Sequence, residues 1–248
     1  MFNRRKREPA APDQDAVVDR VLCISAVAML GAIATGVEEG AMDEGAAAKY
    51  VTETHRWLIR EKLAHALSSA ERTLLAKPQP EWTQDEVAEA GWRNESMGVL
   101  LWAIGALEEL PPYDVRFERL PSFVPLLAPT SGFRATASLR SPGAIEKARG
   151  AAELWHWRAR ARHVLESDDP RSKGRDLDAI ACQTATLAFA EGSLPEPIDG
   201  DFPAYGKPFR ALDADEYAAV TSSAVERHHA LNWLAGRGSD WDAVPTDT

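Results

Sequence analysis

The stretch that decides the fold runs from residue 83 to residue 110 and reads TQDEVAEAGWRNESMGVLLWAIGALEEL, with two prolines directly after it. Thr83 is followed three residues later by Glu86, which is the spacing of a capping box at a helix N-terminus. Residues 96–107 contain no charged side chain. A helix that is apolar on every side is buried on every side, so we expect the central helix of the protein here. Pro111 and Pro112 should stop it after Leu110.

Helical periodicity dominates the rest of the chain, and strand-like alternation is scarce. Asp13 and Asp176 are candidate N-caps, and Ser141-Pro142 places an N-cap before a proline at the first helical position. Two Pro-rich segments, residues 111–140 and 192–212, should be irregular excursions, the first with one short helix. The expected helices cover residues 15–37, 43–67, 68 to just before Pro78, 83–110, 141–166, 176–191 and 213–235.

These elements predict an all-α protein, a single irregular helical bundle of six to eight helices around a buried central helix, with two Pro-rich loop excursions. The chain has 248 residues and a net charge of −10, yet residues 4–7 are all basic. We expect residues 1–13 to form a disordered basic tail and residues 14–248 a single helical domain. An acidic body of this kind repels phosphate backbones, so nucleic acid is not an expected partner.

Residues 21–37 lack any charge and raise the question of a membrane. Several small and polar residues lower the apolarity of this stretch, which favours a buried core helix over a membrane segment. The two cysteines, Cys23 and Cys182, do not form a CxxC pair or a metal-ligand spacing. Two free thiols are typical of a reducing compartment, so we expect a cytoplasmic location.

Several segments have a pattern that resembles a known family. The C-terminal part reads VERHHALNWL at 225–234, DWD at 240–242 and TDT at 246–248, and GWRNE at 91–95 precedes LWAIG at 101–105. Further matching segments are LRS at 139–141, HW at 156–157, DFP at 201–203 and GKP at 206–208. Over roughly residues 15–248 the chain resembles the domain of unknown function 4272 family. The resemblance implies a mostly helical, soluble bacterial protein and implies no activity, substrate or cofactor.

Charged and polar side chains interrupt two apolar helix faces. Glu95 and Arg93 lie on the central helix, and Arg227 and Asn232 lie on the last one. A buried charge must be paired or hydrogen-bonded, so Arg227 is expected to pair with Glu95 or Asp242. Asn232 is expected to hold the returning C-terminal tail near residues 240 and 241. The candidate polar cluster therefore comprises Arg93, Glu95, Arg227, Asn232, Asp240 and Asp242. It would be either a structural ion-pair network or a ligand site.

Two further sites are weaker candidates. Glu153-x-x-His156 and Glu226-x-x-His229 each place two ligands on one helix face, as in ferritin-like bundles with two metal ions. Glu95 with Glu53 or Glu61 would complete such a site. Short motifs of this kind also arise by chance, so we expect neither a metal nor another cofactor. Four of the eight tryptophans could line a pocket: Trp92, Trp102, Trp233 and Trp241.

The sequence contains no GxSxG, GxxxxGK[ST], GxGxxG or HExxH template. The function is therefore open, and two hypotheses from different classes remain. The first is a soluble cytosolic helical module, not an enzyme, that binds a protein partner or a small ligand. The second is an enzyme that uses the buried Glu, His and Arg side chains, in its sharpest form with the two-metal site.

Overall fold

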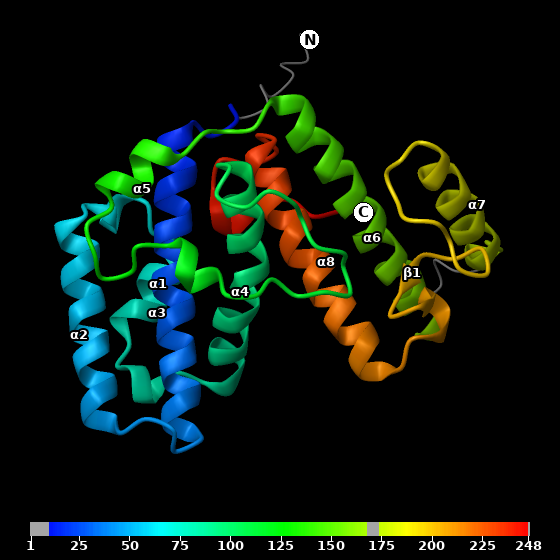
Figure 1. Ribbon diagram of the computed structural model, residues 1–248. Helices are drawn as coiled ribbons and strands as arrows, with labels where there is room; N and C mark the ends of the chain where they lie inside the picture. Colours follow the sequence, from blue (N-terminus) through cyan, green and yellow to red (C-terminus); the bar gives the residue numbers. More distant parts are fainter. Residues whose placement is uncertain (1–9, 168–173, 248) are drawn as a thin grey trace, which may run out of the picture.

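The computed structural model describes residues 10–167 and 174–247, and within them the protein is almost entirely helical (Figure 1). The described part contains eight α-helices, which confirms the predicted all-α class. The helices are α1 (Gln14–Glu38), α2 (Glu44–Arg60), α3 (Ser69–Ala76), α4 (Gln84–Ala103), α5 (Ser131–Thr136), α6 (Pro142–Glu166), α7 (Leu177–Ala190) and α8 (Ala214–Leu234). The predicted tail of residues 1–13 lies largely outside the described residues.

Short elements join these helices. Five are 3-10 turns: η1 (Leu63–His65), η2 (Gln79–Glu81), η3 (Leu120–Phe123), η5 (Phe209–Ala211) and η6 (Trp241–Ala243). The strands β1 (Pro203–Ala204) and β2 (Lys207–Pro208) pair antiparallel. Tyr205 and Gly206 between them both have positive φ angles, as a tight hairpin turn requires. The two Pro-rich segments are thus irregular, as expected, and contain only short helices and this hairpin.

Helix starts follow the capping pattern of the sequence closely. Side chains at the N-cap accept a backbone hydrogen bond at α1, α2, α3, α4, α6, α7 and α8. Three of these starts are complete capping boxes: Ser68 with Glu71, Thr83 with Glu86, and Asp213 with Glu216. Each cap satisfies N–H groups that the first helical turn leaves without a partner, which is why the starts could be predicted.

Two helix ends differ from the prediction. The central helix α4 ends at Ala103 rather than at Leu110, because Gly105 adopts a positive φ of 77°. The N–H of Gly105 then donates to the carbonyl of Trp102, and the N–H of Ala106 donates to that of Leu101, which together form a Schellman motif. The second helix ends at Arg60 rather than near residue 67, because Lys62 adopts a positive φ before η1.

Helices α1, α4, α8 and α6 pack in that order (Figure 1). The larger of two hydrophobic clusters takes buried residues from α1, α4 and α8, together with α2, α3 and the first half of α6. Helix α4 is central only in its second half, where residues 95–103 are buried, while most of its first half is partly or fully exposed. Helix α1 shares the central position, with buried residues from Val17 to Ile33. The smaller cluster joins α6, α7, α8 and the hairpin, and Tyr113 contacts both clusters.

Helix α1 is long and apolar enough to cross a membrane by length and composition alone. Of its most apolar window, 83% is buried inside the protein. Two ionised side chains lie within it: Arg20 pairs with Glu71, and Asp19 pairs with Arg134. Because their partners lie on other segments of the fold, α1 has the character of a core helix.

Candidate functional site

The first candidate site is the buried ion pair between α4 and α8. Arg227 donates from Nε and from a terminal nitrogen to Glu95 Oε2, at 2.8 Å in each case. Both side chains are about 1% exposed. Removal of two charges from water is costly, so the pair depends on good geometry and on further hydrogen bonds that satisfy the remaining atoms.

Those further hydrogen bonds come from the Pro-rich segment that follows α4. The guanidinium of Arg227 also donates to the carbonyls of Pro111 (2.6 Å), Pro112 (3.2 Å) and Val115 (2.8 Å). The backbone N–H of Phe117 donates to the second oxygen of Glu95 at 3.1 Å. The polar atoms of this pair are therefore occupied by the protein itself. The arrangement anchors the loop to α4 and α8 and leaves no free group for a ligand.

Arg93 does not take part in this pair, although the sequence grouped it with Glu95. Its guanidinium lies 3.6 Å from Glu71 on α3, which also binds Arg20 of α1. Glu71 is fully buried, and its second oxygen also accepts the N–H of Ser68 in the capping box. The separation arises because Arg93 and Glu95 are two residues apart on a helix and so face different neighbours.

The C-terminal tail accounts for the remaining members of the predicted cluster. Asn232 donates to the carbonyl of Pro245 at 2.8 Å. Asp242 accepts the N–H of Ala70 at 2.8 Å, and Asp240 caps η6. Burial tends to raise the pKa of Asp242, but hydrogen bonds from the Ser68 side chain and the Ala70 N–H outweigh it and lower that pKa. These polar groups hold the tail against α3 and α8.

The histidines are brought together in a different combination from the predicted one. His156 Nδ1 and His228 Nδ1 lie 3.0 Å apart in the interior. Asn232 Nδ2, which donates to Pro245, also lies 3.0 Å from His228 Nε2. His228 Nε2 must therefore accept a hydrogen bond from Asn232. The proton of neutral His228 then lies on Nδ1, which donates to His156. Burial, with His156 nearby, lowers the pKa of His228 to about 4. Burial, with Arg160 nearby, also lowers the pKa of His156.

The proposed two-metal alternative is wrong in its geometry. His229 Nε2 contacts the Trp241 carbonyl at 2.8 Å, and Glu226 accepts a hydrogen bond from Ser96 at 2.7 Å. Within residues 10–167 and 174–247, no group of three or more His, Cys, Asp and Glu side chains could hold a metal ion. The other proposed ligands bind elsewhere in the protein: Glu153 with Arg149, Glu53 with Arg56, Glu61 with Thr130 and Glu95 with Arg227.

The four tryptophans proposed for a pocket have protein partners instead. Arg116 lies over the ring of Trp92 and Arg140 over that of Trp102. Trp233 and Trp241 pack edge to face with ring centroids 5.3 Å apart. None of the four lines either of the two cavities described next.

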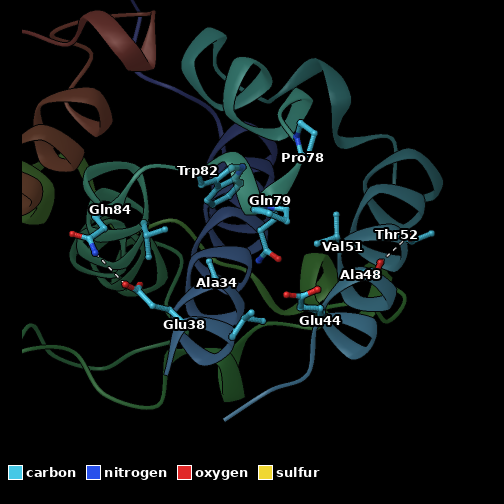
Figure 2. A pocket seen from close by; sticks show the side chains of 14 residues that line it. Ala34, Glu38, Glu44, Ala48, Val51, Thr52, Pro78, Gln79, Trp82 and Gln84 are labelled. Atoms are coloured by element: carbon cyan, nitrogen blue, oxygen red, sulfur yellow. Dashed lines mark hydrogen bonds between the residues drawn. The ribbon is translucent and has the colours of Figure 1, made fainter. Parts of the chain in front are cut away.

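A cavity of about 580 Å³ lies between α1, α2, η2 and the start of α4 (Figure 2). A second, of about 290 Å³, lies between α1, α4 and residues 117–126. The larger one falls within the range of 300–1,000 Å³ typical of small-molecule pockets. We call it the α1–α2 pocket. Its lining residues are Ala34, Val37, Glu38, Glu44, Ala47, Ala48, Val51, Thr52, Pro78, Gln79, Pro80, Trp82, Gln84 and Val87.

The polar groups of the α1–α2 pocket are few. Figure 2 shows the Gln79 amide and the Glu44 carboxylate pointing into the space between the helices, and the bond from Gln84 to Glu38 at 3.0 Å. Gln79 donates to the Leu30 carbonyl at 2.7 Å, so its own oxygen remains as an acceptor. Trp82 is 9% exposed, and its indole N–H has no hydrogen-bond partner among the described residues. An unpaired buried donor of this kind is uncommon.

This pocket was not among the sites that the sequence predicts. Its lining comes from residues 34–38, 44–52 and 78–87, and most of its members are small residues that look unremarkable alone. One signal was present: Trp82 lies two residues after Pro80, in a connection too short to bury a large ring by itself. Such a tryptophan must pack against other elements, and here it joins the larger hydrophobic cluster and lines the pocket.

The fold and this pocket define an all-helical protein with a small-molecule-sized apolar cavity among its N-terminal helices. The chain belongs to the family described as Domain of unknown function (DUF4272), which matches residues 3–172. The match ends before the segments at 201–208 and 225–248 that carry part of the resemblance. No curated protein and no solved structure matches the chain.

Proposed function

We propose that this protein is a binding module for a small, largely apolar ligand, and that the ligand occupies the α1–α2 pocket. The observation that carries the proposal is the pocket itself: about 580 Å³, apolar in most of its lining, with a tryptophan and a few convergent polar groups. Pockets that bind small molecules have this composition.

The rest of the molecule favours this pocket over the buried polar cluster. Arg227 and Glu95 are sealed and satisfied by backbone groups, so a ligand would have to displace existing hydrogen bonds. The pocket needs no such exchange, since the Gln79 amide points into it and keeps a free oxygen. Both cysteines are free thiols, which supports a reducing, cytoplasmic location as part of the proposal.

The test uses N-phenyl-1-naphthylamine, an uncharged probe whose fluorescence rises in apolar surroundings. We expect saturable binding to the full-length protein with one site per chain. Ala34→Phe fills the pocket from α1, because Ala34 is half-buried in the lining, and should weaken binding at least tenfold. Ala48→Phe on α2 provides a second pocket variant from an exposed backbone position.

The matched control is Ala179→Phe, at an exposed position of α7 that does not line the pocket. It adds the same ring to the surface and should leave probe binding unchanged. Helical content measured by circular dichroism shows that each variant is folded. If both pocket variants bind the probe as tightly as the control variant does, the ligand site is not in this pocket and the proposal fails.

A further inference from the structure

The two segments that bound the α1–α2 pocket carry one sign of charge. Residues 38–48 contain four acids and no base, and residues 78–90 contain four acids and no base. Two of these acids, Glu38 and Glu44, line the pocket, and the lining contains no Lys, Arg or His. Both are exposed, so they lie where the pocket meets solvent. Two bases adjoin these segments in the sequence. Lys77 pairs with Glu86, and Lys49, which follows Ala48 on α2, does not line the pocket.

Helix ends reinforce or balance these charges. The C-terminal end of α1, at Glu38, adds partial negative charge from the helix dipole. The N-terminal ends of α2 and α4 add partial positive charge, but Asp43 caps the first and the Thr83–Glu86 box caps the second. Acids in their first turns, Glu44 and Glu86 among them, offset the remaining dipole charge. The mouth of the pocket is therefore net negative.

The side-chain oxygens of Glu44 and Gln79 at the pocket are hydrogen-bond acceptors, so they favour a ligand that donates a hydrogen bond. Glu44 presents carboxylate oxygens, and Gln79, whose nitrogen is already committed to Leu30, presents an oxygen. Deeper in the lining, Trp82 offers the apolar face of a large ring. A ligand that matches these groups has a cationic N–H donor and an apolar body.

We propose that the ligand of the α1–α2 pocket is an organic cation, an amine with an alkyl or aryl body. The ammonium group lies at Glu38 and Glu44, and the apolar body lies against Trp82 and Val51. This inference rests on the proposed function and names its ligand class. The charge of the ligand is the new element, because an apolar cavity alone would bind a neutral or anionic molecule equally well.

The test compares three molecules that share one chain and differ in headgroup charge: octylamine, 1-octanol and octanoate. Each competes with N-phenyl-1-naphthylamine for the wild-type protein. We expect octylamine to bind about five- to tenfold more tightly than 1-octanol, and octanoate to bind most weakly, because exposed carboxylates attract a cation modestly. At about 1 M NaCl, where the Debye length is ~3 Å, the preference should shrink.

The double variant Glu38→Gln/Glu44→Gln removes both charges and keeps the side-chain volumes. It should bind octylamine and 1-octanol within about twofold of each other, with 1-octanol affinity unchanged. The matched control is the double variant Glu191→Gln/Glu196→Gln, which makes the same change in charge at exposed positions outside the pocket lining and should keep the preference for octylamine.

Equal affinity of the three molecules for the wild-type protein overturns the inference and leaves the proposed function standing. Failure of all three, together with failure of the naphthylamine probe, overturns both. Retention of the octylamine preference in the Glu38/Glu44 double variant also overturns the inference, because the selectivity then has another source.

Discussion

Arg227→Met tests whether the buried carboxylate of Glu95 depends on the guanidinium of Arg227. Methionine keeps much of the length of the side chain and removes the guanidinium. The substitution deletes both bonds to Glu95 and the donors to the carbonyls of Pro111 and Val115. Glu95 keeps only the N–H of Phe117.

The expected cost follows from the burial of the pair, both members of which are about 1% exposed. Removal of one partner from a buried ion pair leaves an uncompensated charge and costs about 3–5 kcal/mol. The loss of the hydrogen bonds to the backbone carbonyls adds little to this cost if the Pro-rich loop moves and water replaces the lost donor. We therefore expect a loss of about 4 kcal/mol in the free energy of unfolding, a large part of the 5–15 kcal/mol typical of a folded domain.

The assay is urea unfolding followed by tryptophan fluorescence and circular dichroism. Arg93→Met is the matched control, because it removes the same group from a half-buried position 3.6 Å from Glu71. It should cost about 1 kcal/mol. Limited proteolysis gives a second measurement: Arg227→Met should be cut faster within residues 111–117, which Arg227 holds in place.

A double-mutant cycle with Glu95→Gln completes the test. The double variant Glu95→Gln/Arg227→Met should be more stable than Arg227→Met alone, because the unpaired charge is gone. A loss of less than about 1 kcal/mol for Arg227→Met, similar to that of Arg93→Met, would show that Glu95 does not depend on Arg227, and the account of the core given above would be wrong.

Two further predictions concern the interior. The pKa of His228 falls to about 4 in the folded protein, so as the pH drops this histidine takes up a proton in the unfolded chain before it does so in the folded protein. The contribution of neutral His228 to the free energy of unfolding is therefore complete above about pH 6.5, and about 2 kcal/mol is lost by pH 5. Urea midpoints between pH 5 and pH 8 should show this slope and should show less of it in His228→Gln; an equal slope in both proteins would contradict the assignment. Gly98→Ala places a methyl group against the ring of Phe117 and should cost about 1–3 kcal/mol in urea unfolding. Gly91→Ala on the same helix, where nothing lies within 4 Å of the added carbon, should be neutral or stabilising, and equal stability of the two variants would refute this packing.

Local signals determined the helix starts. The caps at Asp13, Asp43 and Thr83 act on N–H groups of the following turn, so sequence spacing alone is sufficient to place them. Helix ends were less predictable. The stop of α4 at Gly105 was missed because Pro111 is a stronger sequence signal, while a glycine ends a helix only where the chain gains by turning.

Local sequence patterns could not predict which partners the charged side chains would bind. Arg93 and Arg227 looked alike in the sequence, as cations on apolar helix faces. The structure gives Arg227 a sealed partner in Glu95 and leaves Arg93 half-buried beside Glu71. His156 contacts His228 and not the residues proposed with it as metal ligands, because this contact depends on how α6 crosses α8.

The sequence by itself determined the helical class, the helix starts and the need for the charge of Glu95 to be neutralised, because each depends on periodicity, neighbours within one turn, or the cost of a buried charge. Only the tertiary structure decided which cation neutralises Glu95 and where the α1–α2 pocket lies. The pocket exists because Ala34, Ala48 and Trp82 come from separate helices and turns that do not fill the space between them. Unfilled space of this kind is a property of how elements pack against one another and has no local sequence signal.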